Sequence, residues 1–444
     1  MSEDTVFALS SPVGGAIAIV RITGSGAYAA LGRVFRCKNA PEHRVMNYGH
    51  VIDSESGETI DSAMACFLEA PATYTGEDMA EIYIHGSRVI AKRTLSVLSR
   101  FLRPAEGGEF TKRAFMNGKL DLSQAEAVMD VISSVTEQGA RMAEEQLAGS
   151  IGSGIKDIKD MRIDILSCVE AALDYPDELE EDTVSALGSE LAPIIDKLDY
   201  LIRGGNAARI FREGAAVAIL GAPNAGKSSL FNALMGTERA IVTSIPGTTR
   251  DTLEETLDIC GAPVRITDTA GIREGADEAE RIGVERARKA GERADLILIA
   301  IDGTKPIDEE SRALIDAAKR GEYRKCLILF TKADKQGFTM DENCAALSPI
   351  AVSSVTGEGL DALKERMAAL LLTKEAESAL VTNSRHIHAL AEAKAALETA
   401  DAAMGTDLDA ADIRTALYAL GQITGREVTA DVIERIFSRF CVGK

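Results

Sequence analysis

The chain contains no tryptophan, only seven cysteines in 444 residues, and no excess of positive charge. The cysteines are scattered without a Cys-x-x-Cys pair, which argues against a disulfide framework and against a zinc site. The formal net charge of −20 argues against broad, non-specific nucleic-acid binding, because phosphate contacts require concentrated lysine and arginine. A nucleic-acid substrate would therefore need local basic patches or a basic partner.

Long apolar runs are absent as well. None approaches the roughly 18 residues that a membrane-spanning helix needs. Residues 1–10 lack the basic segment and the apolar core of a signal peptide. We therefore expect a cytoplasmic protein without membrane contact. Hydrophobic residues still make up 46% of the chain, enough to fill ordinary cores, and the length suits about three domains.

The secondary-structure pattern of the sequence changes along the chain. Residues 1–118 mix β-like and helical patterns and are expected to form an α/β domain. Residues 119–212 and 375–444 have apolar residues at helical spacing, which predicts an all-α domain. Between them, in residues 213–374, strand and helix patterns alternate, as in a mostly parallel, doubly wound sheet. The predicted fold class is therefore multidomain, with a Ras-like α/β domain inserted into the helical domain.

A phosphate-binding loop is the most informative feature that is present. Residues 221–228 match G-x-x-x-x-G-K-S between an apolar strand pattern and a helical pattern. Backbone N–H groups of such a loop turn inward around a polyphosphate, Lys227 reaches the terminal phosphates, and Ser228 holds magnesium. The chain is therefore predicted to bind a nucleoside triphosphate, with contacts from Asn224, Ala225, Gly226, Lys227, Ser228 and Ser229.

Four later motifs follow in the order of a Ras-like GTPase. Threonines after Pro246-Gly247 close over magnesium, and an Asp-Thr-Ala-Gly run meets magnesium and the γ-phosphate. The carboxylate of Asp334 accepts two hydrogen bonds from guanine that adenine cannot offer, which favours GTP over the alternative, ATP. The predicted nucleotide contacts are Thr243, Ser244, Ile245, Pro246, Gly247, Thr248, Thr249, Asp268, Thr269, Ala270, Gly271, Thr331, Lys332, Asp334, Ser353, Ser354 and Val355.

Two positions depart from the usual GTPase pattern. Thr331 stands where the base-reading motif normally begins with asparagine, and we expect guanine selectivity to survive because Asp334 remains. Ile272 stands where Ras-type enzymes carry the glutamine that orients the attacking water. Hydrolysis therefore needs another water-positioning group, and the candidates lie in the acidic segment from Glu274 to Glu280.

The run from Gly108 to Leu122 resembles the signature of the MnmE/TrmE family of tRNA-modification GTPases. Thr75-Gly76-Glu77-Asp78 with His85-Gly86, the phosphate loop with Pro223-Asn224, and Phe440-Cys441-Val442-Gly443-Lys444 extend the resemblance over the whole chain. It implies a potassium-activated GTPase. With a flavin-dependent partner of the MnmG/GidA type, such an enzyme adds a carboxymethylaminomethyl-type group to the wobble uridine of certain tRNAs.

The resemblance also implies a homodimer. In the homodimer that the resemblance implies, the N-terminal domain dimerises and binds 5-formyl-tetrahydrofolate or a related tetrahydrofolate. The G domains of that homodimer also dimerise when GTP and potassium are bound. For the folate-type site it implies Arg21, Glu81 and Lys119, with Lys444 nearby.

Further roles carry over from the family residue by residue. The implied potassium ligands are Asn224, Thr243, Ile245 and Thr248, and the magnesium ligands are Ser228 and Thr249. Glu280 matches the water-orienting glutamate, and Cys441 becomes a candidate for the modification chemistry. Cys-Val-Gly-Lys also has the length of a prenylation box, but Gly443 and Lys444 suit that box poorly.

A second class of function is a GTPase switch that docks on ribosomal RNA as an assembly factor. That class would be marked by an appended basic RNA-binding module. The acidic composition and the run over residues 108–122 argue against it.

Overall fold

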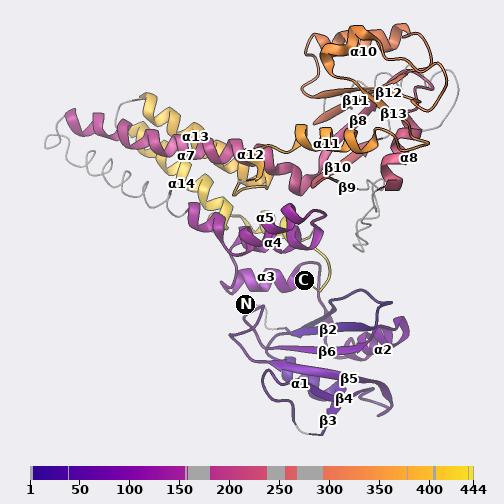
Figure 1. The fold of residues 1–444 in the computed structure, drawn as a ribbon. Coiled ribbons are helices and arrows are strands. Elements are labelled where there is room, and N and C mark those ends of the chain that lie inside the picture. The colour runs from indigo at the N-terminus through magenta and orange to yellow at the C-terminus, as the bar shows by residue number, and fades with distance from the viewer. Residues whose placement is uncertain are drawn as a thin grey trace. The chain divides into compact units, whose positions relative to one another are not determined.

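The structure is a computed structural model that describes residues 4–38, 40–155, 158, 181–237, 256–267, 294–377, 379–403, 407–438 and 440–443. The chain forms two compact units (Figure 1). Among the described residues, the first unit holds 4–129 and 421–443, and the second holds 130–420. The fold class predicted from the sequence, α/β combined with all-α elements, is confirmed; the exact domain boundaries stay predictions.

A seven-stranded sheet with the order β3-β4-β5-β6-β2-β1-β7 organises the first unit. Its strands are β1 (Val6–Leu9), β2 (Ile17–Thr23), β3 (Phe35–Cys37), β4 (Asn47–Ile52), β5 (Thr59–Leu68), β6 (Met79–His85) and β7 (Arg103–Pro104). Neighbouring strands are antiparallel except β1 and β7, which run parallel.

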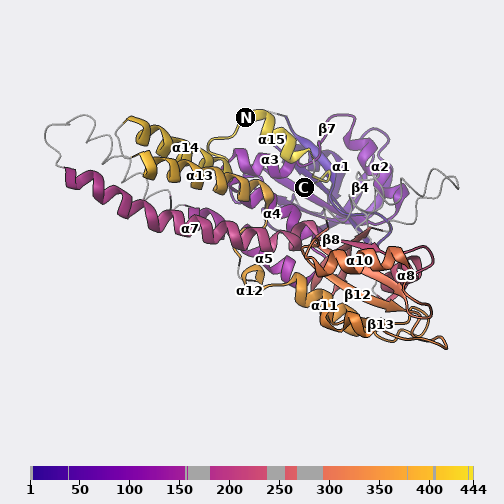
Figure 2. The same cartoon turned by 90° about the horizontal axis from the view of Figure 1, so that it is seen from above.

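Alternation along β2 decides which side chains the sheet buries. Val20 and Ile22 are fully buried in a core shared with α1 (Ala27–Val34) and α2 (Arg88–Leu98). Arg21, between them, points to the opposite face, because successive strand residues alternate. Figure 2 gives a second view of these helices and strands.

The opposite face of the sheet is covered at its β1 side by α3 (Glu109–Met116). Phe110 of α3 is fully buried against Val6 and Ala8 of β1.

The next helix, α4 (Leu122–Ser133), begins with a capping box: the Asp121 carboxylate accepts from the Gln124 N–H at 2.8 Å, and the Gln124 amide oxygen accepts from the Asp121 N–H at 3.0 Å. Asp121, within the family-like run, thus caps the start of α4.

Glycines let the C-terminal segment approach this region closely. The last helix, α15 (Ala430–Phe437), is followed by the segment 440–443. Gly108 has φ +71°, and a Cβ there would lie 2.7 Å from the Phe437 carbonyl oxygen. Gly443 has φ +95°, and a Cβ there would lie 2.6 Å from the Leu9 carbonyl oxygen. Side chains larger than hydrogen would therefore push the two segments apart.

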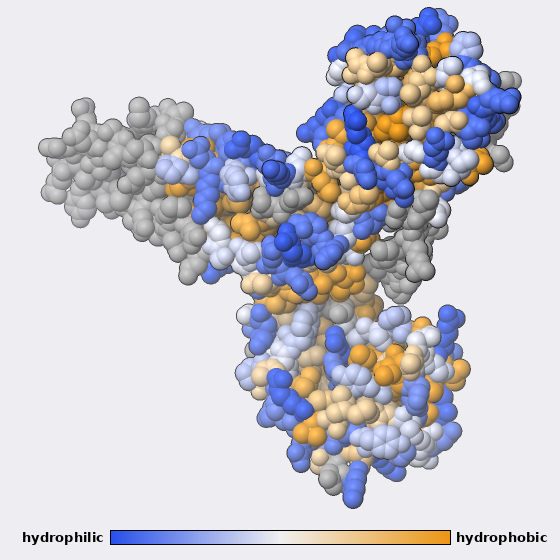
Figure 3. Space-filling model, in the orientation of Figure 1, coloured by the Kyte–Doolittle hydropathy of each residue, from blue (hydrophilic) through white to orange (hydrophobic). Residues whose placement is uncertain are grey.

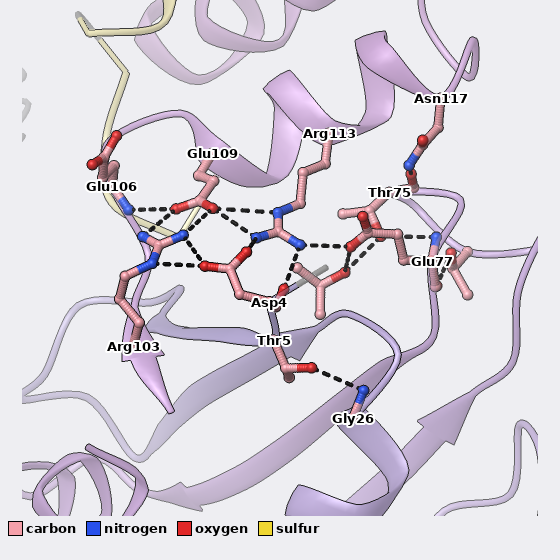
Figure 4. A network of polar contacts seen from close by, with 12 residues as sticks. Asp4, Thr5, Gly26, Thr75, Glu77, Arg103, Glu106, Glu109, Arg113 and Asn117 are labelled. Carbon is pink, nitrogen blue, oxygen red and sulfur yellow. Dashed lines mark hydrogen bonds and ion pairs between the residues drawn. The ribbon is translucent and has the colours of Figure 1, made fainter. Parts of the chain in front are cut away.

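A buried arginine ties α3 to the rest of the first unit (Figure 4). The Arg113 side chain is 6% exposed, and its guanidinium donates to Glu109 at 2.8 Å, to Glu77 at 3.0 Å and to Asp4 Oδ1 at 3.0 Å. Arg103 donates to the same Glu109 carboxylate at 2.8 Å. Burial disfavours the charged carboxylate, but these two arginines hold the pKa of Glu109 below its usual range.

The second unit contains a set of helices outside its sheet. They are α5 (Glu137–Leu147), α7 (Glu181–Glu213), α12 (Lys374–Glu377), α13 (Ser384–Ala403) and α14 (Asp407–Thr424), whose last residues belong to the first unit. Lys394 of α13 donates to Asp199 of α7 at 2.6 Å, and Gln146 of α5 donates to Thr382 at 2.8 Å. Segments far apart in the sequence therefore pack together, as the insertion prediction requires.

A sheet with the order β13-β12-β11-β8-β10-β9 completes the second unit. In chain order its elements are β8 (Ala215–Leu220), α8 (Lys227–Thr237), β9 (Thr256–Ile259), β10 (Ala262–Thr267), β11 (Leu296–Asp302), α10 (Glu309–Lys319), β12 (Cys326–Thr331), the 3-10 turn η1 (Glu342–Leu347), β13 (Ile350–Val352) and α11 (Leu360–Leu371).

Helices cover both faces of this second sheet. Leu298 packs with α8 and α11, whereas its neighbour Ile297 packs with α10. Only β9 runs antiparallel to its partner among the described pairs. The predicted doubly wound sheet is thus confirmed.

On the face shown in Figure 3, hydrophobic residues form separate patches among hydrophilic ones. Among the described helices, none combines the length and hydropathy of a bilayer span.

We expect Glu109→Gln to cost the first unit about 1–3 kcal/mol at pH 7, because two arginines lose a buried anionic partner. A group whose folded pKa is lowered contributes its full stabilisation above its unfolded pKa. The difference from wild type should therefore begin to shrink near pH ~4 and disappear as pH falls through the lower folded pKa of Glu109. Urea unfolding monitored by hydrogen exchange of β1 and β6 measures this. The control is Glu434→Gln, at a side chain 73% exposed. Equal costs for both variants would contradict the network's importance.

Candidate nucleotide-binding site

Five parallel strands bring their carboxyl ends to one edge of the second sheet, and β8, β11, β12 and β13 lead into the predicted nucleotide segments. Register pairs Asp302 of β11 with Thr331 of β12, and Thr331 with Val352 of β13. β8 pairs with β11 on its other side, and the phosphate loop follows β8 directly. Ligands of open α/β sheets bind outside this edge. The segments that the sequence assigns to phosphate and to base therefore meet there.

The phosphate loop is shaped by its backbone. A Cβ at Gly221 would collide with the Ala300 carbonyl, so glycine is required for β8 to turn beside β11. Asn224 has φ +63° and Gly226 has φ +88°, which curls the loop toward the start of α8. Lys227 donates to the carbonyls of Gly221 and Ala222 at 2.7 and 2.9 Å. The lysine thereby lies over the loop where a phosphate would be bound.

Thr331 joins the base-reading motif to the phosphate loop. Its side chain is 2% exposed, and its hydroxyl lies 2.7 Å from the Ala225 carbonyl oxygen and 3.1 Å from that of Ile301. The hydroxyl therefore holds the loop against β11 and β12. The residue that departs from the usual asparagine is thus placed beneath the phosphate loop, which the sequence alone did not indicate.

The base-reading carboxylate is held in place by the last strand. Asp334 is exposed, and its Oδ1 accepts from the Ser353 hydroxyl at 2.6 Å. That hydrogen bond lowers the pKa of Asp334, so the group is a carboxylate at neutral pH. The Ser353 oxygen in turn accepts from the N–H groups of Val355 and Thr356 at 3.2 and 3.1 Å. Two predicted base contacts are therefore fixed to each other.

Oxygen donors at the phosphate loop suit the predicted cations. Ser228 and Asn224 are both exposed at the loop, and a hydroxyl and an amide carbonyl are ligands that hard cations prefer. Ser229 and Ser354 are described and lie at the phosphate loop and after β13, whereas other predicted contacts lie outside the described residues. They are Thr243, Ser244, Ile245, Pro246, Gly247, Thr248, Thr249, Asp268, Thr269, Ala270, Gly271, Glu280 and Lys444.

Two of the predicted folate-type contacts meet on the face of the first sheet that lies opposite the core formed with α1 and α2. Arg21 of β2 and Glu81 of β6 are register partners, and the Arg21 Nε donates to the Glu81 carboxylate at 2.7 Å. Tyr83 donates to the other oxygen of Glu81; burial, together with that carboxylate, raises the pKa of Tyr83 to about 12. Lys119 bonds elsewhere, to the Pro71 carbonyl at 3.1 Å.

Cys441 lies in the segment after α15 and is half-buried. Its carbonyl accepts from the Gly108 N–H at 3.2 Å, and Val442 bridges with Gly107. The terminal segment and the 107–108 turn are thus joined by their backbones. The cysteine is a free thiol in the structure, and its predicted role in the modification chemistry stays a prediction.

A strand, phosphate loop and helix, with a base-reading carboxylate at the same sheet edge, define a P-loop GTPase. Family models narrow this class. The N-terminus of the GTP-binding protein TrmE matches residues 5–119, and the MnmE helical domain matches residues 122–441. The chain belongs to the MnmE family of tRNA modification GTPases and is a GTP hydrolase.

Curated relatives are similar over their whole lengths. The tRNA modification GTPase MnmE of Natranaerobius thermophilus is 39% identical over 461 residues, covering 100% of both chains. That of Geobacillus thermodenitrificans is 41% identical over 462 residues, covering 99% of each chain. That of Acetivibrio thermocellus is 40% identical over 459 residues, covering 100% of this chain and 99% of the relative.

We expect Thr331→Val to weaken GDP binding about tenfold and to cost the second unit about 1–3 kcal/mol, because the isosteric side chain leaves the Ala225 carbonyl without its buried donor. Isothermal titration with GDP, with thermal unfolding alongside, measures both. Thr331→Ser keeps the hydroxyl and should retain most of the affinity. If serine and valine variants bound GDP equally well, the hydrogen bond would have no part in shaping the loop.

Proposed function

We propose that this chain is a potassium-activated GTPase that drives modification of the wobble uridine of certain tRNAs. The observation that carries the nucleotide assignment is the shared sheet edge, where Lys227 covers the phosphate loop and Ser353 fixes the Asp334 carboxylate. The family membership supports the tRNA role. The product is a carboxymethylaminomethyl-type group at the wobble position.

In this proposal the site's own residues bind and orient GTP. Lys227 leaves the loop carbonyls for the terminal phosphates, Asp334 reads the guanine edge, and Ser228 with Thr249 holds magnesium. Potassium, when bound, supplies the positive charge that an arginine finger supplies in other GTPases. Asn224 is its ligand among the described residues, with Thr243, Ile245 and Thr248 as further ligands. Glu280 orients the attacking water.

The remaining parts of the proposal concern partners and place of action. The enzyme acts in the cytoplasm as a homodimer, with a flavin-dependent partner of the MnmG/GidA type and tRNA as substrate. A tetrahydrofolate supplies the one-carbon unit and binds near Arg21 and Glu81. The charge pair on the sheet face opposite α1 and α2 supports that location, because an arginine suits a carboxylate or carbonyl and a glutamate suits an amino-pyrimidine edge.

Potassium should accelerate GTP hydrolysis at saturating GTP, whereas sodium at equal ionic strength should not, because the smaller ion fits potassium ligands poorly. Phosphate release followed in the two salts measures this. Equal rates in potassium and sodium would remove the cation from the mechanism while leaving the GTPase assignment intact.

Glu280→Ala should lower the rate of hydrolysis about 10²–10⁴-fold, the usual contribution of a positioned acid–base group. Binding of a non-hydrolysable GTP analogue should stay close to wild type, since Glu280 is assigned to the water. Single-turnover hydrolysis and equilibrium binding separate the two. Glu278→Ala, two residues away, is the matched control, and similar losses in both variants would argue for a general effect of the acidic segment.

A further inference from the structure

An ion pair outside the GTPase motifs lies at the base-reading end of the second sheet. The Lys332 ammonium donates to Asp302 Oδ2 at 2.6 Å. The Asp302 and Lys332 side chains are 14% and 25% exposed. Asp302 ends β11 and Lys332 directly follows β12, so the pair crosses between two strand ends. Nothing in the sequence motifs assigned Asp302 a role.

The Asp302 carboxylate is itself firmly held. Its Oδ1 accepts from the Thr304 hydroxyl at 2.6 Å and from the Thr304 N–H at 3.0 Å. Burial disfavours its charge, but Lys332 and Thr304 lower the pKa of Asp302 to about 2. The Gly303 N–H donates to the Thr331 carbonyl at 3.2 Å, which joins the two loops through their backbones. The lysine therefore has a rigid, anionic anchor.

The backbone of Lys332 explains why an anchor matters. Lys332 has φ +62°, a conformation that residues with a Cβ rarely adopt. Thr331 before it points under the phosphate loop, and Asp334 after it is exposed for the base. The lysine stem thus starts between the two halves of the nucleotide site. A free lysine would sample many rotamers there, and each nucleotide-binding event would have to order it.

We propose that Asp302 is a positioning residue for the guanine site, which fixes the Lys332 ammonium so that the lysine's methylene stem forms a wall of the purine pocket. This inference rests on the proposed guanosine-nucleotide function and deepens it. The wall contacts the purine ring without reading its exocyclic groups. Asp334 alone then distinguishes purines with a 2-amino group from those without one. Asp302, in contrast, strengthens the binding of every purine nucleotide.

The test compares GDP with inosine diphosphate, which lacks the 2-amino group that Asp334 reads. Asp302→Asn should weaken binding of both nucleotides by about the same factor, roughly tenfold, because an unanchored stem must be ordered on binding. At saturating GTP the rate of hydrolysis should stay at the wild-type value, so that KM rises while kcat does not. Asp308→Asn is the matched control, an aspartate that caps α10 through the Ser311 N–H at 2.7 Å.

A second variant separates positioning from folding. Lys332→Met keeps the stem and loses the ammonium, so it should weaken both nucleotides as Asp302→Asn does. In the Lys332→Met background, Asp302→Asn should have no further effect on affinity. Should Asp302→Asn fail to fold, unchanged affinity of Lys332→Met would still overturn the inference.

The outcomes distinguish this inference from the proposed function. If wild type prefers GDP and Asp302→Asn binds both nucleotides as wild type does, the positioning role is wrong and the guanine site stands. If Asp302→Asn weakens GDP much more than inosine diphosphate, Asp302 acts through Asp334, and the wall assignment is wrong. If wild type does not prefer GDP over inosine diphosphate, the proposed guanine site fails, and this inference fails with it.

Discussion

The hydrogen bond between the buried Thr331 hydroxyl and the Ala225 carbonyl is the contact on which the nucleotide site depends. The phosphate loop and the base-reading motif are more than a hundred residues apart in sequence. Because the parallel register places β12 two strands from β8, a side chain at the end of β12 can reach the loop. One short polar side chain thus sets the distance between the two halves of the site.

The first unit depends on a comparable buried contact. The Arg113 guanidinium pairs with carboxylates from three separate segments. Replacing this arginine with a neutral residue would destabilise the unit, because the carboxylates would lose their buried cationic partner. Around it, the glycines at 107 and 108 admit the C-terminal segment. The run that marks the family therefore has a structural explanation: much of it holds α3, α4 and the tail together.

Sequence reasoning succeeded where one local pattern was sufficient. The runs from Val217 to Leu220 and from Leu296 to Ile301 are continuously apolar, and the structure has a strand over each. β8 begins two residues earlier than its run, and β11 ends one residue later than its run. The loop from Gly221 to Ser228 is recognisable by its glycines and lysine. In contrast, β4 was not anticipated, although buried Gly49 and Val51 alternate with exposed Tyr48 and His50. Its polar outer face hid that pattern.

The sequence by itself determined the kind of chemistry: a phosphate loop, a guanine-reading carboxylate and the family to which the chain belongs. These depend on residue types at fixed short spacings. Only the tertiary structure decided how Thr331 supports the loop, how Ser353 orients Asp334, and that Asp302 holds Lys332. Those partners come from different strands, and a side chain's neighbours across a sheet follow from strand order and register, which no local spacing encodes.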